Sequence, residues 1–210
     1  WKEAISFADG LGRAARTQSV DSVGGDVFTL TCYDDFGRPS KTTNPFRGYS
    51  SQSCSTANGT NDIYWTANAF DTAGRPSTVT TPDGAVVTTA YGLATSGGEI
   101  GTAVTVTDQA LKLRRSVTNA LGQLIRVDEP TDPTNNGIGN LGDISAPNQK
   151  TTYDYDTLNN LTPVYKGSQT RTIVYERLSS LKSQPNPATG PTNYTYDSNN
   201  NLATKFDARS

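Results

Sequence analysis

The carboxylates are the side chains in this sequence whose spacing would allow chemistry. Pairs occur at Asp34-Asp35, Asp128-Glu129 and Asp154/Asp156, and two neighbouring carboxyl groups can act as general acid and general base. Histidine is absent from all 210 residues, which removes Ser-His and Cys-His dyads and the commonest zinc ligand. Because Asp is also a strong turn former, we expect the pairs to be structural and the chain not to be an enzyme.

Two segments rich in oxygen side chains make calcium the only metal worth considering. They run from Asp154 to Asn159 and from Asp197 to Asn201. Neither has the glycine and the bidentate glutamate of an EF-hand loop. We therefore expect Asx turns in both places, and no cofactor.

Cys32 and Cys54 are the only thiols. An even count in a polar, Asn- and Thr-rich chain is typical of a secreted protein with one disulfide. Two separate buried thiols are the alternative, since free cysteine is among the most buried residue types. The spacing alone leaves both possibilities open.

Tyr64 and Trp65 are the aromatic pair that could bind a ligand. Aromatic rings next to amide side chains are suited to stacking on sugars, which makes a glycan contact one interpretation. Large aromatics are costly to expose without a partner, so a role in the protein interior is the other interpretation, and the one we favour.

The elements that carry these residues must be short strands. The chain holds 19 Gly, 11 Pro and no Met, and only 33% of its residues are hydrophobic. Thr, Tyr and Val favour half-buried strands, whereas Gly, Pro, Asn and Asp favour turns. The net charge of −2 without a long basic run argues against a nucleic-acid partner. No stretch approaches the roughly 20 apolar residues of a membrane helix.

A seven-residue motif repeats along the chain, and its positions are numbered 1 to 7 here. The segments Tyr33–Pro39 and Phe70–Pro76 both read aromatic, Asp, two variable residues, Gly, Arg, Pro. The same frame fits copies that begin at Tyr155, Tyr175 and Tyr196, and weaker copies that begin at Ala8, Thr107 and Thr118. A ninth begins at Phe206-Asp207. The longer intervals between copies are interpreted as degenerate second repeats or inserted loops.

The motif predicts one β-hairpin per copy. The aromatic residue ends a strand, and the Asp at position 2 can begin an Asx turn. Position 5 is Gly or Asn in six copies, and these residues best tolerate a positive φ. Leu111 and Ser179 break that rule. The predicted turn residues are Asp9, Gly12, Tyr33, Asp34, Gly37, Phe70, Asp71, Gly74, Gly122, Tyr155, Asp156, Asn159, Tyr175, Tyr196, Asp197 and Asn200.

The repeated motif resembles the tyrosine-aspartate (YD, or Rhs) repeat family over nearly the whole chain. The segments Tyr153–Leu161 and Tyr194–Leu202 are most similar to its consensus. Members of that family include bacterial Rhs proteins, insecticidal toxin shells and teneurins. The resemblance implies an all-β fold in which stacked hairpins form a spiralling antiparallel sheet, shell-like or solenoid-like.

The resemblance also implies a function. We expect residues 1–210 to be one repeat array, a fragment of a longer chain, with an exposed loop inserted at 131–148. The expected role is a structural scaffold of a secreted or cell-surface bacterial protein, forming part of a shell that encapsulates or displays another component. The alternatives are a self-assembling extracellular filament or tube subunit and a carbohydrate or cell-surface binding module. The expected partners are the rest of the array or further copies of the chain, and cell-surface glycans are a further candidate.

Overall fold

The computed structural model describes residues 3–21, 24–47, 53–54, 64–130, 141–186 and 190–207. In these ranges the regular structure is β-strand, apart from one turn of 3-10 helix. No helix among them is long and apolar enough to cross a membrane. The all-β prediction is therefore confirmed.

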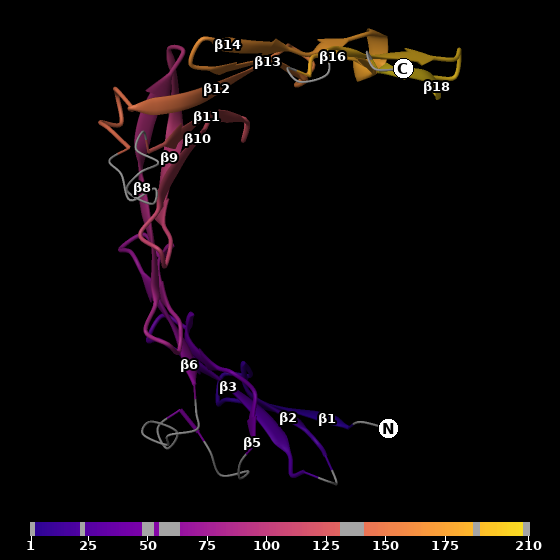
Figure 1. Ribbon diagram of the computed structural model, residues 1–210. Coiled ribbons are helices and arrows are strands. Elements are labelled where there is room, and N and C mark those ends of the chain that lie inside the picture. Colours follow the sequence, from indigo (N-terminus) through magenta and orange to yellow (C-terminus); the bar gives the residue numbers. More distant parts are fainter. Residues whose placement is uncertain are drawn as a thin grey trace. The chain divides into compact units, whose positions relative to one another are not determined.

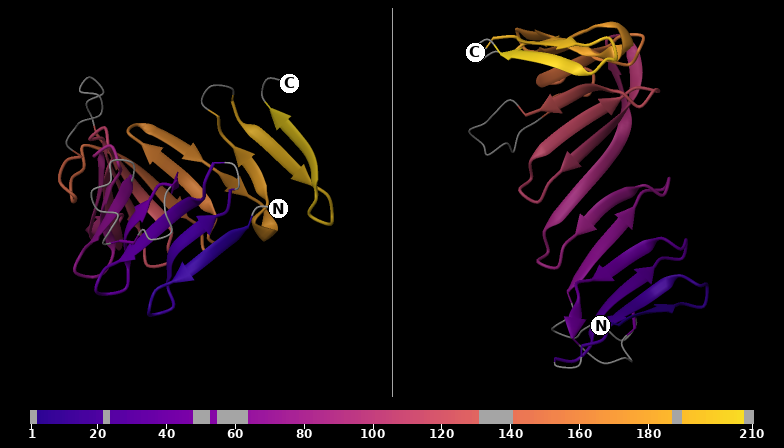
Figure 2. Two further views of the ribbon diagram at one scale, coloured as in Figure 1. Left: turned by 90° about the horizontal axis from the view of Figure 1, so that it is seen from below. Right: turned by 90° about the vertical axis from the view of Figure 1, so that its right-hand side faces the viewer.

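Hydrogen bonds join fourteen strands into one antiparallel sheet whose order follows the chain, and four further strands form a second sheet. The chain divides into two compact units, Trp1–Thr89 and Ala90–Ser210. Figure 2 shows the strands of each hairpin joined by tight turns. This is the hairpin-by-hairpin order that the repeated motif predicts.

The N-terminal unit is built from seven strands and the start of an eighth (Figure 1). The strand pairings described for it are antiparallel, and β5 pairs with β3 outside the main order. The strands are β1 (Ala4–Ala8), β2 (Ala14–Ser19), β3 (Val27–Tyr33), β4 (Pro39–Thr43), β5 (Phe46–Arg47), β6 (Trp65–Phe70), β7 (Pro76–Thr80) and β8 (Val86–Ser96).

The C-terminal unit contains the end of β8, the remainder of the first sheet and the whole second sheet. The first sheet continues with β9 (Glu99–Thr107), β10 (Leu113–Thr118), β11 (Leu124–Glu129), β12 (Gln149–Tyr155), β13 (Leu161–Lys166) and β14 (Gln169–Thr172). The second sheet holds β15 (Val174–Tyr175), β16 (Leu181–Gln184), β17 (Thr192–Tyr196) and β18 (Leu202–Asp207), with the 3-10 turn η1 (Arg177–Ser179) between β15 and β16.

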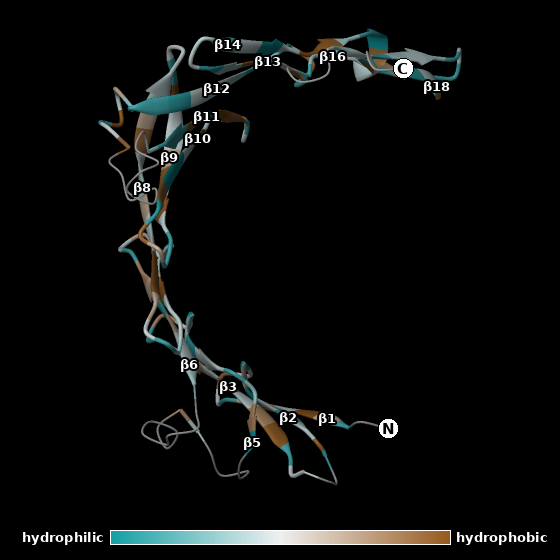
Figure 3. Ribbon diagram, viewed as in Figure 1, coloured by the Kyte–Doolittle hydropathy of each residue, from teal (hydrophilic) through white to brown (hydrophobic). Residues whose placement is uncertain are grey.

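Each unit has only a small hydrophobic cluster. In the N-terminal unit Phe28, Leu30 and Phe46 are buried, with Trp65 packed against them; part of β3 and β5 is brown in Figure 3. The cluster of the C-terminal unit contains Ala94, Ala103, Val117 and Ile125, with Ile144 and Tyr155 packed against it. A single sheet with so little apolar burial needs other contacts between its strands, and the repeat turns supply them.

The expected exposed insertion at 131–148 falls partly outside the described residues, which omit 131–140. In the part that is described, Leu141 is 3% exposed and Ile144 packs against the second cluster. A bridge between Gly142 and Pro147 closes a short loop. Residues 141–148 are therefore a packed part of the C-terminal unit, which the polar composition of the segment did not indicate.

Candidate functional site

The repeat turns share one hydrogen-bond pattern. In all eight copies the backbone N–H of position 2 donates to the carbonyl of position 6, as from Asp34 to Arg38 at 2.9 Å. The strand register shifts by one residue beside the turn, as between Cys32 and Tyr33. A three-residue loop whose last residue is left-handed and forms a bulge has this pattern. The turn therefore fixes the register of each hairpin.

The carboxylate at position 2 caps its own turn. One oxygen of Asp34 accepts the backbone N–H groups of Phe36 and Arg38, at 3.0 and 2.9 Å. Counting this copy, seven copies form the same two bonds. The capping residue is aspartate in six of them and Asn119 in the seventh. Position 5 has a positive φ at Gly12, Gly37, Gly74, Gly122, Asn159 and Asn200. These are the six residues for which a left-handed conformation was predicted.

The two copies without Gly or Asn at position 5 behave differently. Leu111 adopts the left-handed conformation, with φ of 62°, and keeps the whole hydrogen-bond pattern because Asp108 caps its turn. The copy with Glu176 at position 2 instead forms η1, where both Leu178 and Ser179 have positive φ. The side chain of glutamate is one methylene longer than that of aspartate, and it makes no cap hydrogen bond here.

Sequence reasoning missed one turn of the same kind. The N–H of Thr81 donates to Ala85 O and that of Gly84 to Thr81 O, both at 2.9 Å, and Gly84 has a φ of 82°. Asp83 caps this turn from a different position, accepting the N–H of Ala85. The Thr-Pro-Asp-Gly sequence at 81–84 is a strong turn signal, so it could have been found without the aromatic-Asp frame. It accounts for a degenerate repeat in the long interval after Phe70.

A side chain from one turn reaches the next turn on the same edge of the sheet. We call the side-chain contacts between successive turns on one edge the seam. One kind of seam contact joins position 6 of one copy to position 5 of the following copy. The Nη1 atom of Arg13 lies 3.1 Å from where a Cβ on Gly37 would be, and Arg38 lies 3.4 Å from the same point on Gly74. Where position 5 is Asn, its Oδ1 accepts a hydrogen bond across the seam, from Gln123 to Asn159 and from Ser180 to Asn200.

The tyrosine at position 1 also crosses the seam. The hydroxyl of Tyr155 donates to the carbonyl of Leu124 at 3.0 Å, which is position 7 of the preceding copy. Tyr33 donates to Ala14, and Tyr196 to Leu181, each at 2.9 Å and in the same relation. The tyrosine therefore links repeats, whereas the aspartate beside it shapes a single turn.

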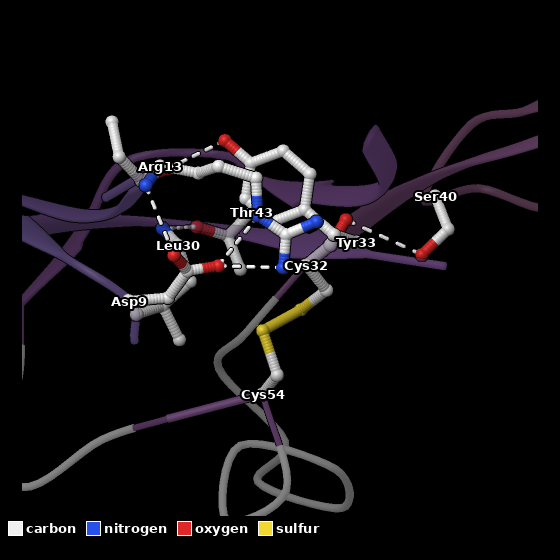
Figure 4. Close-up of a disulfide and its surroundings, with 9 residues drawn as sticks. Asp9, Arg13, Leu30, Cys32, Tyr33, Ser40, Thr43 and Cys54 are labelled. Atoms are coloured by element: carbon white, nitrogen blue, oxygen red, sulfur yellow. Dashed lines mark hydrogen bonds and ion pairs between the residues drawn. A yellow bond between two sulfur atoms is a disulfide. The ribbon is translucent and has the colours of Figure 1, made fainter. Parts of the chain in front are cut away.

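In the N-terminal unit the seam is made by arginine. The guanidinium of Arg13 bonds Asp9 in its own turn, with Nη2 and Oδ2 2.6 Å apart, and lies over the ring of Tyr33 at 4.2 Å. Figure 4 shows this group beside the disulfide. Arg38 pairs with Asp34 and lies over Phe70 in the same way. Phe70 has no hydroxyl group and cannot make the hydrogen bond that Tyr33 makes to the preceding copy. The guanidinium of Arg38, which lies over the Phe70 ring, links the two copies instead.

The hydrogen bonds in the turns lower the pKa of their carboxyl groups below the ordinary 3.8. For Asp156 the cause is the side-chain bond from Asn160, followed by the backbone bond from Asn160. For Asp9 the side-chain bond from Arg13 is the main cause of the lowered pKa. At Asp34 desolvation acts to raise the pKa, and the bonds from Arg38 outweigh it. These carboxylates are ionised, hydrogen-bonded parts of the turns.

The carboxylate pairs proposed for acid/base chemistry do not meet as pairs. Asp34 and Asp156 cap turns. Asp128 is fully buried, whereas Glu129 points to the opposite face of β11 and pairs with Lys166 at 2.9 Å. Among the described residues no group of three or more Cys, Asp or Glu side chains could hold a metal ion.

A buried ion-pair network that the sequence did not reveal surrounds Asp128. Arg115 Nε donates to its Oδ2 at 2.6 Å, and Arg126 Nη2 donates to the same oxygen at 3.1 Å. Both arginines are less than 10% exposed. Arg115 Nη2 also donates to the backbone carbonyl of Asp143. Arg126 Nη2 donates to the carbonyl of Ile144, and Arg126 Nη1 to that of Thr95. The network therefore fastens the 141–148 segment to β8, β10 and β11.

Cys32 and Cys54 form a disulfide, the first of the two alternatives. It ties the interval between β5 and β6 to β3. The aromatic pair is split: Trp65 packs against the Phe28 cluster, while Tyr64 is 55% exposed. The two residues therefore lie in different environments: Trp65 begins β6 and is partly buried, whereas Tyr64 precedes the strand and is exposed.

Three solved structures match this antiparallel architecture. They are described as "Crystal Structure of TcdB2-TccC3-Cdc42", "Crystal Structure of TcdB2-TccC3 without hypervariable C-terminal region" and "Crystal Structure of TcdB2-TccC3". The TM-score is 0.65 for each, with 15%, 16% and 15% identity. The matches cover 98–99% of this chain and 11% of the other. The chain shares its fold with a part of TcdB2-TccC3.

The sequence comparisons add one finding. A family model described as a domain of unknown function (DUF6443) matches residues 1–85, which nearly coincides with the N-terminal unit. No curated protein matches the chain. The likeness to TcdB2-TccC3 at this identity establishes the fold, and the chain spans about a tenth of the length of those structures.

Proposed function

We propose that this chain is a segment of a YD-repeat scaffold that forms part of the wall of a β-shell outside the cell. The seam carries the proposal. It joins the copies that begin at Ala8, Tyr33 and Phe70, the copies at Thr118 and Tyr155, and the copies at Tyr175 and Tyr196, through side chains whose positions repeat with the motif. A single hairpin is marginal alone, and such linkage makes a wall from many.

Three further observations support this role. The fold match covers nearly the whole chain. The disulfide suits an oxidising compartment. The turn carboxylates are occupied by structural hydrogen bonds, so we propose no catalytic site for the segment. Enclosing or displaying another component is the corresponding function.

Cryo-electron microscopy of the product of the complete gene that encodes this chain tests the proposal. Residues 3–207 are expected to fit density for one stretch of a closed wall around a cavity. An open filament or tube built from many copies would instead support the self-assembling alternative. A compact particle without a cavity would contradict both.

A further inference from the structure

A cleft on one face of the C-terminal unit has the features of a ligand site. Its volume is about 400 Å³, within the usual range of roughly 300–1,000 Å³ for ligand pockets. It lies over β10 to β14, on the opposite face from the Arg115–Asp128 network, as the alternation along β10 and β11 requires. Gln184 and Pro185 close one end of it.

The floor of this cleft is largely apolar. Val127 and Thr151 are buried, and they lie on adjacent strands in direct register. Val164 and the ring of Tyr153 continue the floor, and these two residues are also in register. Such a floor suits an aliphatic or aromatic group better than a bare inorganic ion.

The rim of the cleft is positively charged. Three cations, Arg114, Lys166 and Arg171, and one carboxylate, Glu129, line it. Lys166 and Glu129 neutralise each other at 2.9 Å, which leaves the two guanidinium groups. Both arginines are exposed, and neither makes a hydrogen bond or ion pair within the described part of the chain. Two unpaired cations over an apolar floor stand out in a chain whose net charge is −2.

The sheet geometry sets the size and direction of a ligand. Arg114 lies on β10 and Arg171 on β14, which is four strand spacings apart, or roughly 19 Å at about 4.8 Å per spacing. The register also offsets the two residues by about four positions along the strands, roughly 13 Å, so their separation along the diagonal is roughly 23 Å. β11, β12 and β13 each pair on both sides, so a ligand cannot add as a strand among them. It must cross the strands and be recognised by side chains.

We propose that this cleft binds an extended acidic polypeptide segment, with a carboxylate on Arg114, a second on Arg171, and apolar side chains on the floor between them. At about 3.3 Å per residue, roughly seven residues span the positions of the two arginines. Guanidinium pairs well with carboxylate, which two N–H groups can bond at once. The site does not depend on the shell function proposed above.

Fluorescence anisotropy tests the assignment. The probe is a labelled heptapeptide with glutamates at both ends and valines and threonines between, and the control peptide has lysines in place of the glutamates. The acidic peptide is expected to bind, more weakly at higher salt, and the lysine peptide is not. The double variant Arg114→Gln/Arg171→Gln should weaken binding by at least about tenfold.

A variant matched in charge is Arg177→Gln/Lys205→Gln, which changes two exposed cations outside the cleft. It should bind as the unmodified chain does, and circular dichroism should show both double variants folded. No binding of the acidic peptide, equal binding of the lysine peptide, or equal loss in both double variants would overturn the proposal. Competition by glutarate as effective as that by the unlabelled peptide would assign the cleft to small dicarboxylates and overturn the polypeptide assignment.

Discussion

The hydroxyl of Tyr155 donates a hydrogen bond to the carbonyl of Leu124, one repeat earlier, at 3.0 Å. Burial, followed by the neighbouring Tyr153, raises the pKa of this phenol above its ordinary 10.0, so it remains a donor at physiological pH. The same bond recurs at Tyr33 and Tyr196. It explains why the motif pairs an aromatic hydroxyl with an aspartate.

Replacing Tyr155 by phenylalanine isolates the contribution of its hydroxyl group to the stability of the fold. Tyr155→Phe should lower the free energy of unfolding by about 1 kcal/mol, the usual net value of one hydrogen bond. Urea denaturation measures it. The control is Tyr165→Phe, at a half-exposed tyrosine of β13 whose hydroxyl makes no hydrogen bond within the described residues, and it should change little. Equal effects of the two substitutions would argue against the seam.

Replacing Leu111, which has a left-handed backbone conformation, should stabilise the protein. Leu111→Gly removes a side chain from a residue with φ of 62°, and should raise the free energy of unfolding by about 1 kcal/mol. Leu121→Gly is the matched control, since Leu121 is the exposed fourth residue of another copy and has no positive φ. It should give no gain, because glycine loses more backbone entropy on folding. A gain at both positions would mean that backbone strain is not the cause.

The buried carboxylate should be among the most sensitive residues. Asp128→Asn leaves two buried guanidinium groups without their anion, and is expected to cost about 3–5 kcal/mol in thermal or urea unfolding. Glu129→Gln, which removes only the exposed partner of Lys166, should cost less than about 1 kcal/mol. Similar losses for the two variants would show that the network stabilises no more than a surface pair.

The turn carboxylates should make the fold sensitive to acid. Hydrogen bonds lower the pKa of Asp156 and Asp197 below 3.8. Their stabilisation is therefore complete above pH 3.8 and lost as the pH falls through the lowered values. In Asp156→Asn/Asp197→Asn, unfolding measured between pH 5 and 2 should depend less on pH, and Asn119 shows that an amide can cap this turn.

Two other aspartates supply the control for the acid experiment. In the described ranges the side chains of Asp35 and Asp154 make no hydrogen bond. Asp35→Asn/Asp154→Asn should keep the pH dependence of the unmodified chain. A flattened profile in this control as well would assign the effect to net charge rather than to the turns.

Reduction should loosen the N-terminal unit. The disulfide closes a separation of 22 residues, and a loop of that length corresponds to about 3 kcal/mol in the chain-entropy model. A phosphine reductant should lower the melting temperature of the unmodified chain and leave Cys32→Ser/Cys54→Ser unchanged. An unchanged melting temperature in both would mean that the disulfide does not constrain the unfolded chain.

The turns were predictable because their cause is local. An aspartate followed three residues later by Gly or Asn carries the cap and the left-handed step within five residues, so Asp34 and Gly37 could be assigned without a partner strand. Leu111 shows that the carboxylate is sufficient even without the glycine. The ninth copy is predicted to begin at Phe206-Asp207, and residues 208–210 lie outside the described residues.

The seam and the buried network were not predictable from the sequence. The tyrosine bonds join residues 19, 31 and 15 apart, because the connections between copies differ in length, so no fixed spacing marks them. Arg115 and Arg126 look like ordinary polar strand residues. They are buried only because β10 and β11 bring them to Asp128, and the 141–148 segment then covers them.

The central claim is that successive hairpins are coupled through the seam, and hydrogen exchange measured by mass spectrometry tests it most directly. In Tyr155→Phe the exchange of backbone amides should speed up in both hairpins that the bond joins, Leu113–Glu129 and Gln149–Lys166, and stay unchanged in Thr192–Asp207. Faster exchange confined to the strand that carries the substitution would contradict the account.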